Sequence, residues 1–351
     1  MYSRQVIASV QRMSSAVPGV RCVKRQLQNS AAGCGMVYWM STLGEQPGFR
    51  LVTYHRVLES PDPYYSYAIM RPLFDAQLRM FKRFCAVLSL DEIIDRLDRR
   101  QPLPPRCMAI TFDDGYRDTA TVAWPLLKQY DLPATLYVAV QAIANGWLWP
   151  DALRYAIRYT PRRSVLLMSL RKEPREFDLS TEASRLRAVE HLDARLKVIS
   201  NKLKLEVLDE LAWKLVGESL SRFTIPGLML DWAQLRTVCR EGLAIGAHTV
   251  THPILTQVSD REAEGEISLS KRMLEGSLGV PVRHFAYPNG GAADFARRHQ
   301  EMVRAAGFSS AVTTAIGINR LEGNRVALKR VDCTHPSLRQ FVRHLVGGAS
   351  S

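Results

Sequence analysis

Two adjacent carboxylates end an apolar run in the sequence MAITFDDG at residues 108–115. Neighbouring carboxylates repel one another and are costly together unless a cation or an arginine neutralises their charge. The apolar run is typical of a buried strand, so Asp113 and Asp114 are expected at its carboxyl end, where α/β barrels place their active sites. A surface turn is the alternative interpretation, because Asp and Gly favour turns.

A second pattern, GAHTVTHP at residues 246–253, also follows an apolar run. His248 and His252 are four residues apart, and on a helical turn this spacing brings both imidazoles to one side as a pair of metal ligands. Because both patterns end strands, the histidines are expected to meet Asp114 at one barrel face. Two histidines and one carboxylate leave open positions on Zn²⁺ or a similar ion, which is typical of a catalytic metal site.

Two further strand ends carry candidate catalytic groups. The sequence HFAYPNG at residues 284–290 ends in a Pro and Gly turn that can point a backbone N–H at a tetrahedral oxyanion, although an ordinary loop is the alternative. The sequence TYHR at residues 53–56 places His55 at the same face. Amide hydrolysis needs a group that protonates the leaving nitrogen, and histidine suits that role near neutral pH. A histidine that only stabilises the strand end is the competing interpretation.

These groups must be positioned by an alternating pattern of strands and helices, which is the mark of βα units around a parallel sheet or barrel. Capping boxes predict helix starts at Ser89 with Glu92 and at Ser259 with Glu262. Residues 150–225 show helical spacing without a strand pattern, and we expect a helical insertion that caps the barrel mouth. The expected strands are residues 51–55, 108–112, 134–140, 243–247, 284–287, 309–312 and 327–331.

The composition is that of a globular protein. A length of 351 residues fits one large α/β barrel with extensions, and 46% hydrophobic with 23% charged residues exclude a disordered chain or a coiled coil. Residues 1–47 lack sustained periodicity, so we expect a poorly ordered extension before a barrel over residues 48–351. Six scattered cysteines predict reduced thiols. No apolar run of signal-peptide or membrane-spanning length is seen, which predicts a cytoplasmic or membrane-peripheral chain.

The charge balance is strongly positive, with 47 Lys and Arg against 34 Asp and Glu, or +13. Such a surface attracts phosphates, acidic glycans or an anionic membrane, and a soluble basic enzyme is the plain alternative. Apart from Tyr155 and Tyr159, the Arg-rich stretches lack interleaved aromatic residues, so nucleic acid is not an expected partner. The sequence indicates no oligomeric state. The candidate ligands for a phosphorylated or lipid-linked substrate are Arg154, Arg158, Arg162 and Arg163.

The motifs TFDDG, HTVTHP and FAYPNG together resemble the polysaccharide deacetylase family over about residues 48–149 and 228–332. That family includes chitin, peptidoglycan and nodulation-factor deacetylases and shares a distorted (β/α)7 barrel. The resemblance implies that Asp113 is the general base and that a divalent metal ion, usually zinc, is bound by Asp114, His248 and His252. The early TYHRV is similar to the branch that deacetylates poly-N-acetylglucosamine, which implies that His55 is the general acid.

Two positions depart from the family pattern. Many members carry an arginine partner of the base where this chain has Ala286, and Arg330 at the end of the last expected strand is a candidate replacement. Asn289 stands where they carry tyrosine, and its N–H is the candidate oxyanion donor. The aromatic and proline residues of these motifs are candidate substrate-binding residues, namely Tyr54, Tyr116, Tyr287 and Pro288.

The chemistry predicted is metal-dependent hydrolysis of N-acetyl groups in an N-acetylhexosamine-containing glycan or glycolipid, with release of acetate. An O-acetyl esterase acting on a polysaccharide would pass through the same intermediate and stays an alternative. A catalytically silent glycan-binding barrel would keep the fold without turnover. A glycoside hydrolase would instead need two carboxylates about 5 to 10 Å apart across a cleft.

Overall fold

The structure is a computed structural model that describes residues 48–170 and 175–334. The predicted N-terminal extension and residues 335–351 lie outside this part of the chain. Within it, no helix combines the length and apolar character needed to cross a membrane. Cys85, Cys107, Cys239 and Cys333 are free thiols, as expected.

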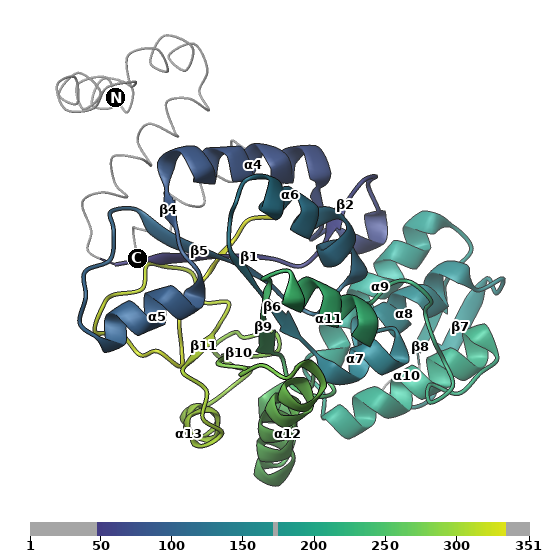
Figure 1. The fold of residues 1–351 in the computed structure, drawn as a ribbon. Helices are drawn as coiled ribbons and strands as arrows, with labels where there is room; N and C mark the ends of the chain where they lie inside the picture. The colour runs from purple at the N-terminus through teal and green to yellow at the C-terminus, as the bar shows by residue number, and fades with distance from the viewer. Residues whose placement is uncertain (1–47, 171–174, 335–351) are drawn as a thin grey trace, which may run out of the picture.

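The main sheet curls into a distorted (β/α)7 barrel (Figure 1). Its strands pair in parallel in the order β11-β10-β9-β6-β5-β1-β12, and the short β4 adds to β5. Because the strands are parallel, their carboxyl ends and the loops that follow them share one face. The strands are β1 (Arg50–Tyr54), β4 (Ala86–Val87), β5 (Cys107–Phe112), β6 (Ala134–Val138), β9 (Ala244–Ala247), β10 (His284–Ala286), β11 (Ser310–Val312) and β12 (Val331–Asp332).

The barrel is most distorted where the sheet closes. The strand expected at residues 327–331 is divided between two partners, since Leu328 bridges to Val312 of β11 while Val331 pairs with Val52 of β1. The segment thus leaves one edge of the sheet and joins the other. This division accounts for the error in the predicted boundary of the last strand, whereas the other six strands lie within two residues of their expected limits.

Helices cover the outside of the sheet (Figure 1). Ser259 and Glu262 form the predicted reciprocal capping box. Ser89 accepts a hydrogen bond from the Glu92 N–H, but the Glu92 carboxylate pairs with Arg96, so only half of that predicted box forms. The helices are α4 (Arg71–Phe84), α5 (Leu90–Asp98), α6 (Trp124–Gln129), α7 (Val140–Asn145), α11 (Trp232–Arg240), α12 (Asp260–Leu278) and α13 (Arg297–Ala305). Short elements are β2 (Val57–Leu58), β3 (Ile69–Met70), the 3-10 helices η1 (Pro63–Tyr65) and η3 (Leu255–Gln257), and the π-helix η2 (Thr119–Ala123).

The insertion forms a unit beside the barrel with a hydrophobic cluster of its own (Figure 1). It contains α8 (Trp149–Tyr159), β7 (Ser164–Leu167), β8 (Arg175–Asp178), α9 (Glu182–Leu196) and α10 (Asn201–Val216). The prediction that it lacks strands is wrong, because β7 and β8 pair as an antiparallel hairpin. Alternating burial explains the hairpin, since Val165 and Leu167 point inward between exposed neighbours.

Candidate active site

The two adjacent aspartates follow β5 in a tight left-handed turn. The Asp113 N–H donates to the Tyr54 carbonyl at 3.0 Å, which extends the sheet contact by one residue. Asp114 and Gly115 then adopt φ angles of 78° and 90°. An aspartate tolerates this region better than most side chains, and glycine enters it without a steric penalty. The turn leaves both carboxylates buried, with Asp113 2% and Asp114 7% exposed.

Arg330 neutralises Asp113 from inside the barrel. Its Nη1 and Nη2 atoms lie 2.7 and 2.6 Å from the two Asp113 oxygens, and its Nε donates to the Thr313 carbonyl at 2.9 Å. Burial raises the pKa of Asp113, but the Arg330 guanidinium and the nearby His248 and His55 together hold it below its ordinary value, so Asp113 is ionised at neutral pH. The pairing proposed for Arg330 from its strand position is therefore present, and its effect on catalysis through Asp113 stays a prediction.

The three predicted metal ligands converge beside Asp113. The Nε2 atoms of His248 and His252 are 3.1 Å apart, and each is 3.5 Å from the same Asp114 oxygen. Ligand atoms about 2.0–2.1 Å from a zinc ion at tetrahedral angles lie about 3.3 Å from one another. The spacing of these atoms therefore fits a single small divalent ion, and all three residues are buried.

The protonation states of the three ligands are coupled. The His248 Nδ1 lies 2.7 Å from the Ala286 carbonyl, so Nδ1 donates to it and Nε2 faces Asp114. Burial opposes protonation of His248, but its contacts with Asp114 and Asp113 hold its pKa above the ordinary value. Burial and the neighbouring His248 lower the pKa of His252 to about 3, and the histidines hold the pKa of the buried Asp114 below its ordinary value. A cation bound by these residues would take the place of the proton on His248 Nε2, because neutral imidazoles and an ionised carboxylate are the forms that bind a metal ion.

The loop that carries the histidines is not a helical turn, so that part of the prediction is wrong. Thr249 and His252 have φ angles of 64° and 59°, and the His252 N–H donates to the Thr249 hydroxyl at 3.0 Å. The carbonyl of Thr249 accepts from the Val140 N–H, and the carbonyl of Val250 accepts from the next N–H of α7. The first turn of that helix thus anchors the loop, and the spacing of four residues works through an irregular backbone.

Glu266 on α12 holds the same loop from the other side. One carboxylate oxygen accepts from the N–H groups of Val250 and Thr251 at 2.7 and 2.8 Å, and the other accepts from the Thr251 hydroxyl at 2.6 Å. These three bonds fix the turn between the two histidines. Sequence reasoning missed Glu266, because a glutamate inside an amphipathic helix carries no local sign of a distant partner.

His55 follows β1 and lies at the edge of the site. Its Nε2 is 3.9 Å from an Asp113 oxygen, and its side chain is 28% exposed. The ring of Tyr67 packs edge-on against it at 5.5 Å, and the Tyr67 and Tyr116 hydroxyls are 2.9 Å apart. His55 is thus close to the base, open to solvent and supported by an aromatic side chain that the sequence did not single out.

Asn289 stands in a turn after β10, the strand that neighbours the histidine-bearing β9. Asn289 has a φ of 58°, the Gly290 N–H donates to the Pro288 carbonyl at 2.7 Å, and the Gly290 carbonyl accepts from Thr314 at 3.0 Å. In residues 48–170 and 175–334, the Asn289 N–H has no hydrogen-bond acceptor. The turn has the predicted form, with a free donor, while the oxyanion role of Asn289 stays a prediction.

Comparisons with known proteins match the geometry. A model of the polysaccharide deacetylase family matches residues 100–173 and 190–310. This chain belongs to the polysaccharide deacetylase family. Its members are hydrolases, and the deacetylase described here shares with them the candidate His and Asp metal site.

Solved structures share the fold of the deacetylase at low sequence identity. The Streptococcus pyogenes deacetylase PplD, in complex with acetate, is 19% identical with a TM-score of 0.57, covering 86% of this chain and 99% of that one. A de-N-acetylase from Aggregatibacter actinomycetemcomitans is 16% identical with a TM-score of 0.51, covering 84% and 99%. The putative polysaccharide deacetylase YxkH of Bacillus subtilis is 42% identical over 40 residues, or 11% of this chain and only 14% of that protein.

The predicted substrate-binding tyrosines of the deacetylase are buried. The Tyr54 hydroxyl donates to Gln77 at 2.5 Å, and the Tyr287 hydroxyl donates to the Val326 carbonyl at 3.0 Å. Both rings pack in the main core, so the prediction that they contact substrate is wrong. Tyr116 is also buried, with its hydroxyl 3.0 Å from Asp151. Pro288, likewise buried, helps to shape the turn that precedes Asn289.

Two of the four insertion arginines proposed as phosphate ligands are engaged within the protein. Arg158 Nη1 lies 2.7 Å from Asp62. The Arg154 side chain is 11% exposed and lies 4.0 and 3.8 Å from Asp151 and Asp193. Arg162 and Arg163 are exposed and the Arg158 side chain is 34% exposed, so only Arg154 is enclosed, and contact of these arginines with a phosphate stays a prediction.

Proposed function

We propose that this deacetylase removes N-acetyl groups from N-acetylhexosamine units of a glycan or glycolipid and releases acetate. The observation that carries the proposal is the ionised Asp113, held by Arg330 beside three converging metal-ligand atoms yet outside that ligand set. The site thus offers a base and a metal position separately. The shared fold with a de-N-acetylase supports an amide substrate.

Asp114, His248 and His252 would hold the divalent ion, and two nitrogens with one oxygen favour Zn²⁺. When bound, such an ion supplies Lewis-acid chemistry, because it polarises a carbonyl oxygen and makes water more acidic. Asp113 accepts the proton of the attacking water, since Arg330 keeps its carboxylate ionised. Water then adds to the acetyl carbonyl.

Two further groups complete the reaction. The free N–H of Asn289 donates to the carbonyl oxygen as negative charge develops there, a contribution of a few kcal/mol in comparable sites. His55 protonates the departing nitrogen, because an amine anion is a poor leaving group. Its partial exposure and its position 3.9 Å from Asp113 place it at the edge of the site, where it can reach the leaving nitrogen of a substrate bound beside both groups.

Acetate release from N-acetylglucosamine substrates, before and after removal of bound metal, tests the proposal. We expect turnover that is lost with a chelator and restored by Zn²⁺, and that is absent in the Asp113→Asn variant, which keeps its metal. Turnover of O-acetylated polysaccharide alone would replace the amide with an ester as the substrate. Full activity in the metal-free protein would contradict the proposal.

A further inference from the structure

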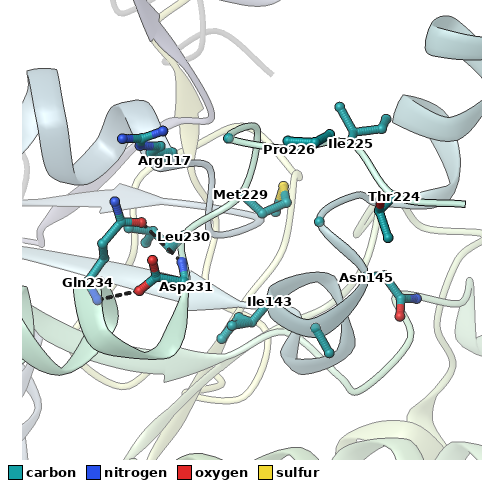
Figure 2. Close-up of a pocket in the computed structure, with 13 residues that line it drawn as sticks. Arg117, Ile143, Asn145, Thr224, Ile225, Pro226, Met229, Leu230, Asp231 and Gln234 are labelled. Carbon is teal, nitrogen blue, oxygen red and sulfur yellow. Dashed lines mark hydrogen bonds between the residues drawn. The ribbon is translucent and has the colours of Figure 1, made fainter.

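An open cavity with a volume of about 340 Å³ is bordered by the loop after β5, the loop that also carries Asp113 and Asp114 (Figure 2). This volume falls in the range of about 300 to 1,000 Å³ that is typical of small-molecule sites. Its walls come from the loop after β5, the end of α7 and the segment 224–231 that leads from the insertion into α11. The polar side chains that line it are Arg117, Asn145, Thr224, Asp231 and Gln234.

The cavity is held open by a fixed frame. The Arg117 N–H donates to the Leu228 carbonyl, and the Leu230 N–H donates to the Gly115 carbonyl, both at 3.0 Å. On the other side, the backbone of Ile225 lies so close to Gly146 that a Cβ there would be 2.9 Å from the Ile225 oxygen. Segment 224–231 is thus fastened to both neighbouring walls, so the cavity is preformed.

The cavity and the metal ligands share one loop. Arg117 follows Asp114 by three residues, which places their Cα atoms at most about 11 Å apart. A glycan that presents one unit to Asp114 therefore needs only a short extension to reach Arg117. An antiparallel bridge joins Tyr116, which stands between Asp114 and Arg117 in the chain, to Met229 in the cavity wall.

The polar groups of the cavity have unused hydrogen-bonding capacity. Within the described chain, the exposed Arg117 guanidinium has no hydrogen-bond or ion-pair partner. Asp231 and Gln234 form a reciprocal cap at the start of α11. The Gln234 N–H donates to Asp231 Oδ1 at 2.7 Å, and the Asp231 N–H donates to Gln234 Oε1 at 3.1 Å. The second Asp231 oxygen and the Gln234 amide nitrogen remain available, and Figure 2 shows both side chains on the same side of the cavity as Arg117.

This set of groups selects a ligand by chemistry. One guanidinium and one carboxylate cancel in charge, which disfavours a polyanion such as a phosphate ester. Donors and acceptors placed side by side suit the hydroxyls of a sugar, each of which both donates and accepts. The exposed Pro226 adds apolar surface for the C–H face of a ring, whereas the side chains of Met229 and Ile225 are only 5% and 8% exposed.

We propose that this cavity binds a neutral sugar unit of the same glycan chain whose N-acetyl group lies at Asp114. This inference rests on the proposed function and adds where a sugar unit beyond the one at Asp114 is held, namely in the cavity beside Arg117. Binding in the cavity then raises kcat/KM for longer chains through added contacts remote from the reacting atoms.

The test compares the full-length wild type with Arg117→Ala on N-acetylglucosamine and on its 1,4-linked and 1,6-linked tetramers. Arg236→Ala is the matched control, because Arg236 is exposed on α11 and does not line the cavity. We expect the better tetramer to exceed the monomer in kcat/KM, and Arg117→Ala to lower the tetramer value about 10-fold. The monomer value and the control should change less than twofold.

Equal losses on monomer and tetramer, or no loss on either tetramer, would overturn the inference. If Arg117→Ala does not fold, Asn145→Ala replaces it in the same comparison. If neither the wild type nor any variant releases acetate, the proposed function is wrong. Calorimetric titration with the tetramers then tests separately whether the cavity binds a glycan. Weaker binding to Arg117→Ala than to Arg236→Ala supports the inference, whereas equal or absent binding overturns it.

Discussion

Two buried cations lie in contrasting surroundings, one in the barrel and one in the insertion. Arg330 and Lys204 are each 1% exposed. Arg330 donates to both oxygens of Asp113 and to the Thr313 carbonyl. Lys204 Nζ has no hydrogen-bond acceptor among the described residues and lies 5.0 Å from the ring centre of Trp149. A buried charge costs several kcal/mol unless it is paired, so the same burial has opposite consequences at the two positions.

The difference lies in what each position requires. At the candidate active site, Arg330 pairs with Asp113, because the proposed reaction requires an ionised base. In the insertion, apolar packing of α8, α9 and α10 stabilises the fold, and the protein tolerates the unpaired ammonium of Lys204 there. Burial accordingly lowers the pKa of Lys204 to about 8, whereas the pKa of Arg330 stays above its ordinary value despite burial, because Asp113 and neighbouring groups favour its charged form.

Arg330→Met is the substitution in this comparison with the largest expected effect on stability. The substitution leaves the Asp113 carboxylate buried and unpaired, so we expect a loss of stability of about 3 to 5 kcal/mol. The pKa of Asp113 should rise, which moves the acid limb of the rate profile to higher pH, because the base must be ionised to act. Chemical denaturation and acetate release across pH measure both effects.

Arg330→Lys is the matched control, since it keeps the charge but not the two parallel hydrogen bonds. It should retain part of the stability and shift the acid limb less. Unchanged stability in Arg330→Met would show that the pair contributes nothing to the fold.

His55 extends the comparison to a side chain at the edge of the site, which lies 3.9 Å from Asp113 and is 28% exposed. His55→Ala should keep metal and stability near normal while kcat on an N-acetyl sugar falls about 10²- to 10⁴-fold. An activated aryl acetate, whose leaving group needs no proton, should lose much less. The ratio of the two losses is the measurement, and a ratio near one with metal intact would return His55 to a structural role.

The sequence predicts the barrel site better than the insertion, for physical reasons visible in particular residues. Asp113, Asp114, His248 and His252 stand in short motifs at strand ends, and parallel strands bring such ends together whatever the loop geometry. The pairing of Arg330 follows from the same argument. The sequence does not predict the irregular backbone at Thr249, because the positive φ there depends on hydrogen bonds with the first turn of α7.

Other features depend on contacts between distant segments and leave no local pattern. Tyr54 and Tyr287 stand inside the motifs, yet side chains alternate along a strand, and theirs point into the core. The hairpin of β7 and β8 has only four residues in each strand, which is too short to stand out from helical spacing. The cavity beside Arg117 arises only when segment 224–231 packs against the loop after β5.

Lys204→Met tests the other half of the comparison, with the opposite sign. Removal of an unpaired buried charge should stabilise the protein by about 2 kcal/mol at pH 7. The wild type should gain stability as pH rises from about 8 to 10.5, because there the unfolded chain binds a proton that folded Lys204 has lost. Urea denaturation at pH 7 and 10 should show the variant's advantage shrinking. Lys202→Met, at an exposed position of the same helix, should show neither effect.

Glu266 gives the smallest and most local test of how the barrel specifies its polar contacts. Its carboxylate accepts three hydrogen bonds from Val250 and Thr251, so it orders the loop between the metal-binding histidines without touching either of them. Glu266→Ala leaves that loop less ordered in the metal-free protein. Metal binding must then supply the free energy that orders it, which weakens the affinity for the metal. Partners outside a ligand set change metal affinity by about 10- to 100-fold in comparable sites, and we expect the lower end, since α7 still anchors the loop. Zinc titration against a competing chelator measures the change, with Glu264→Ala on the exposed side of α12 as the control. Equal affinity in the two variants would show that α7 alone holds the histidines in place.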